Sequence, residues 1–298
     1  MSTVIGLLFT LLWASAAIAI KFGLLSTTPL ALATIRFILA GGILFLFVYV
    51  IKRNRYPTKK EWLPLLILGL LNTTIYLGAT FWALESVSAG LFNLIVTTNP
   101  FLVALLSAMW LKRGIKKLEW LGMVIAFIGL LIASIPSLSN SSATAVGLMT
   151  LCVGMFSMAL GSVYFKKANL QISGLVINTW QVLIGGIILL PFTYLLEKDR
   201  FFIVYDGFFF GSLVWLTFVI SIGTMMLWFY LLKKDPVKAN NWLFMTPIYG
   251  FVLSALFLGE AVTPFDLTAS AFVIVGLFLS GNIDFSFLRK QRVRSRAS

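Results

Sequence analysis

The chain has no histidine, one cysteine and few charged residues for its length. Asp, Glu, Lys and Arg together make up 11% of its 298 residues. Without histidine, the sequence contains neither a His-based catalytic triad nor the usual zinc ligand sets. The single cysteine, Cys152, excludes an internal disulfide framework. No glycine-rich phosphate-binding motif is present either, so we predict no catalytic residue, no metal and no cofactor.

What the chain has instead is apolar residues in long runs. It is 60% hydrophobic with a mean hydropathy of +0.99, which is more apolar surface than a soluble domain of this size can bury. Because a helix needs about 20 mostly apolar residues to cross a bilayer, we read the sequence in windows of that size. The pattern predicts an all-α polytopic membrane protein with ten transmembrane helices. The expected spans are residues 3–22, 29–51, 62–84, 89–111, 118–136, 145–166, 174–196, 208–232, 238–258 and 266–283.

The basic residues are distributed unevenly between alternate connectors. If the N-terminus is cytoplasmic, most of the 23 Lys and Arg residues fall on inner connectors and the tail, and the outer connectors hold only Lys198 and Arg200. This asymmetry predicts a multi-pass protein of the inner (cytoplasmic) membrane with both termini in the cytoplasm. The charges lie on separate loops without interleaved aromatic residues, so we expect anionic membrane lipids as partners and no nucleic acid.

The two halves of the chain resemble each other. A shift of 147 residues aligns Asn93 with Asn240 and Pro100 with Pro247 without a gap, and a shift of 145 aligns Arg36 with Gln181. We therefore predict two five-helix repeats, joined by a loop and followed by a basic cytoplasmic tail. Their ranges are 1–137 and 145–288 for the repeats, 138–144 for the loop and 289–298 for the tail. Since five crossings is an odd number, the second repeat enters the membrane from the opposite face, as in many transporters.

An ordered set of short motifs resembles the EamA family of the drug/metabolite transporter superfamily. The motifs are Trp13 followed by Lys21, Pro29 with Arg36, Asn93 with Pro100, and Pro247 followed by Leu258-Gly259-Glu260 and Gly276. The resemblance covers essentially the whole chain. It implies transport of a small-molecule substrate, commonly the export of amino acids, related metabolites or drugs. Family members often carry a glutamate in both repeats, whereas this sequence has Arg113 in the first.

Two basic side chains are candidates for substrate binding. Arg36 lies about seven residues inside its helix, so its backbone is expected roughly 10 Å below the outer boundary. A charge at that depth faces a cavity or a partner, and an arginine there can bind a substrate carboxylate through two hydrogen bonds. The alternative is that Arg36, and more easily Lys21, extends its aliphatic stem to reach the outer headgroups.

A second group of candidates lies around the two shared prolines. Asn93, Thr97 and Pro100 occupy one helix face, and Asn240 with Pro247 repeats the pattern. A proline within a span frees a carbonyl and permits a bend, so we predict a substrate-lining helix in each repeat with Pro100 and Pro247 as hinges. The alternative is an ordinary kink sealed by hydrogen bonds between helices.

Aromatic and amide side chains complete the predicted site. They could stack on a flat substrate or attract an ammonium group, although aromatic residues near span ends more often anchor a helix at the membrane interface. The candidates are Trp13, Tyr76, Tyr164, Gln181, Trp228 and Asn241. Gly122 and Ala126 have a spacing that favours close helix packing, either inside the monomer or in a homodimer.

Together these features predict a secondary transporter that works by alternating access around a midplane cavity. We expect spans 1, 3, 4, 6, 8 and 9 to line the cavity, partly from the family resemblance. All ten acidic residues fall in loops or near span ends, which favours a facilitator or exchanger. The alternative is a multidrug or organic-cation exporter with proton antiport through Glu85. A channel or an intramembrane enzyme is less favoured, because no repeated acidic ring and no paired intramembrane acids are visible.

Overall fold

The computed structural model of the protein describes residues 2–112, 114, 116–139 and 143–279. Over these ranges the chain is helical, and its only β-type pairings are two isolated bridges. The helices are α1 (Ser2–Gly23), α2 (Pro29–Phe45), η1 (Leu46–Ile51), α3 (Lys59–Leu68), η2 (Gly69–Leu77), α4 (Gly78–Leu84), α5 (Ala89–Val96), α6 (Asn99–Trp110), α7 (Lys117–Ser139), α8 (Ala145–Ala168), α9 (Gly174–Glu197), α10 (Gly207–Val214), η3 (Trp215–Thr224), α11 (Met225–Lys234), α12 (Pro236–Asn241), η4 (Trp242–Met245), α13 (Thr246–Leu258) and α14 (Pro264–Leu279). The tail predicted at 289–298 and part of the loop predicted at 138–144 lie outside the described residues.

Several helical segments are built to cross a membrane. Consecutive elements join into continuous helical segments, whose limits agree with the predicted spans to within a few residues. Seven segments in the described ranges have the length and hydropathy needed to cross, and two shorter apolar helices, 242–258 and 264–276, follow them. Their outward faces carry large exposed apolar side chains, such as Tyr194, Leu195 and Leu256. Lipid is the solvent that suits such a surface, so the chain is a membrane protein.

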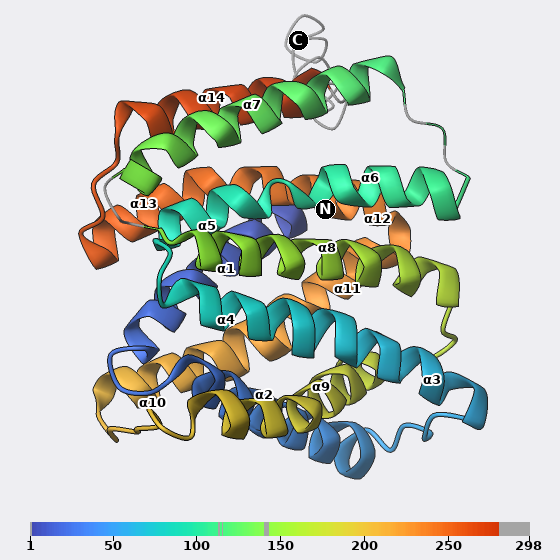
Figure 1. Ribbon diagram of the computed structural model, residues 1–298. Coiled ribbons are helices and arrows are strands. Elements are labelled where there is room, and N and C mark those ends of the chain that lie inside the picture. Colours follow the sequence, from blue (N-terminus) through green and yellow to red (C-terminus); the bar gives the residue numbers. More distant parts are fainter. Residues whose placement is uncertain (1, 113, 115, 140–142, 280–298) are drawn as a thin grey trace, which may run out of the picture.

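The helices form a bundle in which two pairs pack along much of their length. Figure 1 shows α7 and α14 side by side along one edge, and α2 crosses close to α9. Small residues permit these contacts: a Cβ atom at Gly129 of α7 would lie 2.7 Å from Cβ of Phe272 in α14. Gly129 therefore permits close packing of α7 on α14 within the monomer. A Cβ atom at Gly185 would likewise collide with Thr73, so glycine brings α9 against η2.

Two kinds of irregularity interrupt the helices. Wide π-helical turns occupy η2 and η3, which lie in matching places in the two halves of the chain. The helices that contain the shared prolines are also interrupted. α5 ends at Val96, and α6 restarts at Asn99 with Pro100 in its first turn; α13 begins in the same way with Pro247. Proline is favoured in a first helical turn because no earlier carbonyl needs its missing N–H.

The bundle has two chemically different ends. The carboxylate end gathers Glu85, Glu197, Arg200 and Glu260, where α4, α9 and α13 end and α2 and α5 begin. The lysine end gathers the close of α8 and α11, where Lys166 donates to the carbonyl of Lys233. The helices run between these ends in Figure 1, with the α13–α14 connection at the left and the start of α3 at the right.

Candidate functional site

A small closed cavity lies in the middle of the bundle. Its volume is about 30 Å³, and its wall is formed by α1, α2, η2, α4, α5, α9, η3 and α11. That volume holds a water molecule but not a metabolite, because sites for small molecules usually measure several hundred Å³. In this structure the cavity is therefore too small for a metabolite. The π-helical segments η2 and η3 contribute to its wall, as such segments often do at functional sites, whereas η1, another such segment, does not.

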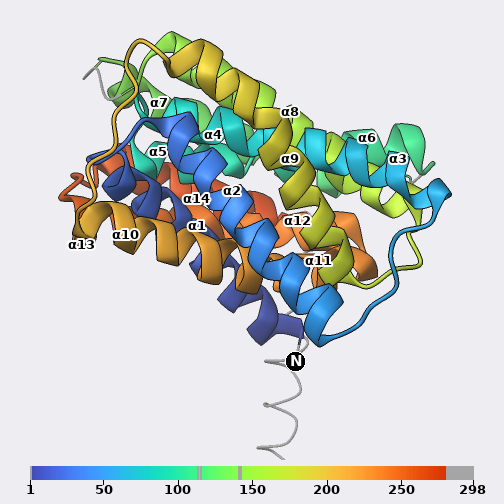
Figure 2. The same cartoon turned by 90° about the horizontal axis from the view of Figure 1, so that it is seen from below.

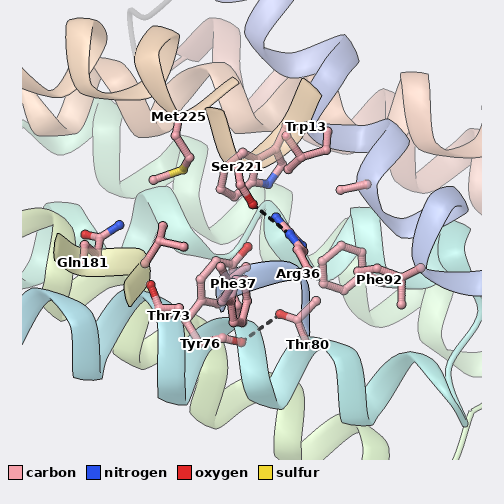
Figure 3. A pocket seen from close by; sticks show the side chains of 15 residues that line it. Trp13, Arg36, Phe37, Thr73, Tyr76, Thr80, Phe92, Gln181, Ser221 and Met225 are labelled. Atoms are coloured by element: carbon pink, nitrogen blue, oxygen red, sulfur yellow. Dashed lines mark hydrogen bonds between the residues drawn. The ribbon is translucent and has the colours of Figure 1, made fainter. Parts of the chain in front are cut away.

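Arg36 is the largest fully buried side chain of the described residues and lies on the cavity wall. Only 2% of its surface is exposed. Its Nε donates a 2.9 Å hydrogen bond to Oγ of Ser221, and its Cζ lies 5.1 Å and 5.4 Å from the ring centroids of Phe37 and Phe81. Figure 3 shows the guanidinium pointing toward Ser221 across the cavity. Among the described residues no carboxylate pairs with Arg36. This position favours the cavity over the headgroups as the place of the charge.

Aromatic side chains cover another part of the wall. The rings of Trp13 and Tyr76 stack almost in parallel, with an interplanar angle of 5° and centroids 6.4 Å apart. Behind Trp13 lie Phe9 and Trp228, whose rings stack on each other at 5.2 Å. Trp13 and Tyr76 line the cavity, whereas Trp228 supports Trp13 from behind.

Neutral polar groups lie on the remaining wall. Gln181 is buried there, and its Oε1 accepts a 2.9 Å hydrogen bond from Nδ2 of Asn72. Thr73 and Thr80 also line the cavity, and Thr80 donates to the backbone carbonyl of Tyr76. Arg36 and Gln181, which the shift of 145 aligned in the sequence, thus lie on the same cavity.

The asparagines predicted to line the site lie between helices instead. Nδ2 of Asn93 donates to the carbonyl of Ala89, and Nδ2 of Asn240 donates to that of Pro236, each four residues back. The hydroxyl of Thr97 likewise donates to the carbonyl of Leu94. None of these three side chains contributes to the cavity wall in this conformation. Nδ2 of Asn93 also donates to the carbonyl of Ala14 in α1, so for Asn93 the geometry matches the alternative of a break sealed by hydrogen bonds between helices.

Other predicted residues also lie away from the wall. Tyr164 is partly buried in α8, Lys21 is half-buried at the end of α1, and the side chain of Asn241 is outside the described residues. The set of lining spans also differs from the prediction. Spans 2 and 7 supply wall residues through α2 and α9, and spans 6 and 9 do not. The tight α2–α9 pairing accounts for this, since it carries Arg36 and Gln181 inward.

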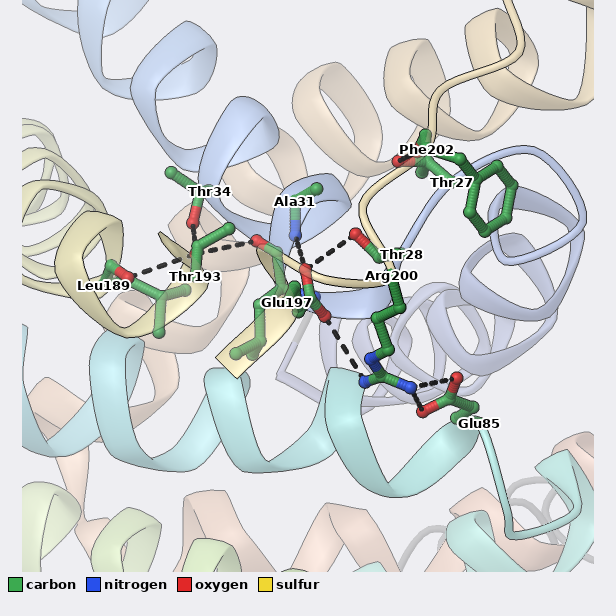
Figure 4. A network of polar contacts seen from close by, with 11 residues as sticks. Thr27, Thr28, Ala31, Thr34, Glu85, Leu189, Thr193, Glu197, Arg200 and Phe202 are labelled. Atoms are coloured by element: carbon green, nitrogen blue, oxygen red, sulfur yellow. Dashed lines mark hydrogen bonds and ion pairs between the residues drawn. The ribbon is translucent and has the colours of Figure 1, made fainter. Parts of the chain in front are cut away.

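Hydrogen bonds to carboxylates tie the helices together at the carboxylate end. Glu197, at the last turn of α9, is fully buried. Its carboxylate accepts hydrogen bonds from the backbone amides of Leu30 and Ala31 at 2.8 and 2.9 Å and from the hydroxyl of Thr28 at 2.7 Å. Arg200 lies 3.7 Å from the same carboxylate (Figure 4). A negative charge at the start of α2 is favoured because it meets free amides and the positive end of the helix dipole.

A second carboxylate makes the same kind of contact at α5. Glu260 accepts hydrogen bonds from the amides of Ala89 and Gly90 at 2.9 and 3.0 Å, and Lys21 lies near enough to interact with its charge. Beside it, Arg200 makes an ion pair with Glu85 at 2.7 Å. Both carboxylates come from the second half of the chain and bind helix starts in the first half. Sequence reasoning placed them only near span ends.

The carboxylate end also has an opening and a further acidic residue. A vestibule of about 270 Å³ opens at the carboxylate end and is lined by Lys21, Thr27, Thr28 and Glu85. Nearby, the amide of Phe209 and the hydroxyl of Ser26 hold the pKa of the Asp206 carboxyl below its usual range.

An apolar groove of about 480 Å³ runs along α4 and α9. The groove is separated from the cavity by η2, whose Thr73 lines the cavity and whose Thr74 lines the groove.

The sequence profile of the EamA-like transporter family matches residues 1–135 and 145–282. The chain belongs to this family. The resemblance seen in the short motifs is thereby confirmed. The family consists of transporters rather than enzymes, in agreement with the missing catalytic sets.

Similar proteins are named as transporters. The chain is 28% identical to the uncharacterized transporter sll0355 of Synechocystis sp., covering 90% of this chain and 86% of that one. It is also 28% identical to the uncharacterized inner membrane transporter YedA of Escherichia coli K12, covering 92% and 89%. A chloroplastic WAT1-related protein of Arabidopsis thaliana is 24% identical over 90% of this chain and 66% of its own.

A protein of known crystal structure shares the fold. It superposes with a TM-score of 0.70 over 94% of this chain and 96% of its own, at 18% sequence identity. This likeness concerns the architecture alone.

Proposed function

We propose that the protein is a secondary transporter that exports small carboxylated metabolites, amino acids or related compounds, by alternating access around the central cavity. The observation that carries this proposal is the unpaired Arg36 guanidinium on a closed cavity whose wall comes from both halves of the chain. A buried cation without a carboxylate partner is costly unless a ligand supplies the anion. The α-carboxylate that amino acids and related compounds share is such an anion.

The ten-span inverted repeat is part of the same proposal. It is supported by the two separate family matches, by η2 and η3, and by the interruptions before Pro100 and Pro247. The packing is also two-fold in pattern: α2 contacts η3 as α9 contacts η2, and α1 contacts α13 as α8 contacts α6. Two equivalent halves provide two equivalent ways to open one site.

The small cavity and the closed carboxylate end fit one state of such a cycle. For a substrate to enter from the vestibule, the second half must release the starts of α2 and α5 that Glu197 and Glu260 hold. We assign the carboxylate end to the outside and the lysine end with both termini to the cytoplasm, because basic loops stay inside. The YedA relative supports placement in the inner membrane.

Net direction is set by the substrate gradients in this proposal. Glu85 is the residue that would carry the proton in the antiport alternative. It is paired with Arg200 at the carboxylate end and does not line the cavity. The aromatic wall is the feature that favours the alternative of organic-cation export, but the charge of Arg36 opposes a cation in the same space. Membrane lipids are the expected partners in this proposal, and the homodimer stays a prediction.

Purified protein in proteoliposomes tests the proposal. Vesicles loaded with each of a panel of amino acids, organic acids, nucleosides and organic cations should show accelerated uptake of the same labelled compound for at least one carboxylated member. The absence of such exchange for every carboxylated compound would refute the proposal, and non-saturating flux would indicate a channel. A pH gradient should not drive uptake; strong acceleration that disappears in Glu85→Gln would establish proton antiport instead.

A further inference from the structure

The cavity wall carries one formal charge. Of the described residues that line it, Arg36 is the one charged side chain, and no Asp or Glu is among them. The nearest structural carboxylates are already engaged, since Glu197 and Glu260 bind helix amides at the carboxylate end. A ligand therefore meets an uncompensated positive charge and no negative one.

The guanidinium leaves most of its donors available. Its Nε is engaged with Ser221, and its terminal nitrogens have no acceptor among the described residues. An arginine binds a carboxylate best through two parallel hydrogen bonds from one edge of its planar guanidinium. The hydrogen bond to Ser221 fixes the orientation of the guanidinium, and the rings of Phe37 and Phe81 hold the group in place.

The rest of the wall suits an uncharged, apolar body. Trp13, Tyr76 and Phe92 present rings, and Ile20, Val182 and Met225 present aliphatic surface. Thr73, Thr80 and Gln181 are neutral polar groups that match a hydroxyl or keto oxygen. An ammonium group would lose its water here without gaining a carboxylate, and it would lie in the same small space as Arg36.

We infer that the cavity selects monoanionic organic acids with an apolar or aromatic body, such as hydroxy or keto acids, over zwitterionic amino acids and organic cations. This inference rests on the proposed function and narrows it. Binding makes the site neutral, with the carboxylate on Arg36 and the body against Trp13 and Tyr76. Because the cavity of about 30 Å³ is smaller than such a ligand, the wall must widen on binding.

Three probes that share a phenylpropyl body and differ in their charged groups test the inference. 3-Phenyllactate is a monoanion, phenylalanine carries an ammonium in place of its hydroxyl, and phenylalaninol is a cation. Isothermal titration of the purified full chain should give a dissociation constant for phenyllactate about tenfold or more below that for phenylalanine, because the ammonium stays unpaired. Phenylalaninol should bind most weakly, because it also lacks the carboxylate that Arg36 binds. In Arg36→Gln, affinity for phenyllactate should fall by about tenfold or more, and its advantage over phenylalaninol, which has no carboxylate, should shrink.

Matched variants separate binding from folding. Arg36→Lys keeps the charge and should keep the ranking with weaker affinity, which preserves the test if Arg36→Gln does not fold. Lys198→Gln removes an exposed cation remote from the cavity wall and should change neither affinity nor ranking. An unchanged affinity for phenyllactate in folded Arg36→Gln would overturn the role of Arg36.

The outcomes also distinguish this inference from the proposed function. If phenylalanine or phenylalaninol binds best and is exchanged by proteoliposomes, the protein transports but the monoanion selectivity is wrong. If none of the three probes binds, the selectivity for an aromatic or apolar monoanion is wrong, and the wider exchange panel decides whether the protein transports at all.

Discussion

Glu197 and Arg36 are both charged and almost completely buried, but the protein treats them differently. The Glu197 carboxylate receives two backbone amides, one hydroxyl and a nearby arginine. Arg36 has one serine hydroxyl and two aromatic rings. Burial of a charge is costly unless its hydrogen bonds are supplied, so a saturated charge is suited to structure. A charge left with free donors is suited to binding, and the predictions below test this distinction through the free energy of unfolding.

The largest loss of stability is expected for Glu197→Ala. The substitution leaves the amides of Leu30 and Ala31 and the hydroxyl of Thr28 without their acceptor, which should cost about 3 kcal/mol. Chemical denaturation in mild detergent measures the change. Asp199→Ala, at an exposed acid two residues further on, is the matched control and should stay within about 0.5 kcal/mol. Equal effects of the two substitutions would contradict the role given to Glu197.

A smaller loss is expected for Glu260→Gln. This carboxylate binds the first two amides of α5, but the hydroxyl of Ser88 already accepts from Leu91 at the same helix start. The remaining helix cap and a retained amide oxygen limit the loss to about 1 kcal/mol. The same denaturation experiment measures this loss of stability. A loss as large as that of Glu197→Ala would show that the Ser88 cap does not replace the hydrogen bonds of Glu260.

The ion pair between Arg200 and Glu85 should contribute less still. Both side chains are about two-fifths exposed, and exposed pairs contribute about 0.2 to 1 kcal/mol. A double-mutant cycle with Glu85→Gln and Arg200→Gln isolates the coupling between them. Because Arg200 also lies 4.4 Å from the Trp82 ring centroid, the single arginine substitution should cost more than the coupling alone. A coupling above about 2 kcal/mol would be inconsistent with a solvent-screened pair.

Arg36→Met should change stability least and transport most. Replacing a buried, poorly paired charge by an apolar side chain of similar length is often neutral or stabilising. The free energy of unfolding should therefore stay within about 1 kcal/mol of the wild-type value, while exchange of carboxylated substrate is lost. If Arg36→Met instead destabilises the protein as much as Glu197→Ala, Arg36 is a structural charge and the comparison fails.

The membrane-crossing elements could be predicted from the sequence because each depends on its own composition. Runs of apolar residues, the turn at Pro29 and the interruptions at Pro100 and Pro247 are local properties. Arg36 was also recognisable as a candidate, since a charge inside an apolar run is costly and usually faces a cavity or a partner.

The partners of these residues could not be predicted in the same way. Ser221 is an ordinary hydroxyl until η3 brings it opposite Arg36, and Asn93 becomes an interhelical residue only through the packing of α1, α5 and α13. Glu197 carried one overlooked signal: an acid in the last turn of a helix opposes the helix dipole, and a buried partner compensates for it.

The two ends of the bundle differ in sign for a related reason. The shifts of 145 and 147 residues align Glu197 with Lys52 and Glu260 with Arg113. A cation cannot accept a hydrogen bond from the start of a helix, so Lys52 and Arg113 cannot do what Glu197 and Glu260 do. At the lysine end, α9 is capped by its own Ser173. Among the described residues, the two carboxylates that hold helix starts of the other half, Glu197 and Glu260, both lie at one end.

A reversible disulfide across the carboxylate end tests alternating access most directly. Thr27 and Ile203 come from different halves and form an antiparallel bridge, a separation that suits a disulfide. In a Cys152→Ser background, oxidation of the Thr27→Cys, Ile203→Cys protein should stop substrate exchange, and reduction should restore it, with each single substitution insensitive to oxidant. Full exchange by the oxidised, cross-linked protein would contradict the claim that the carboxylate end must open for transport.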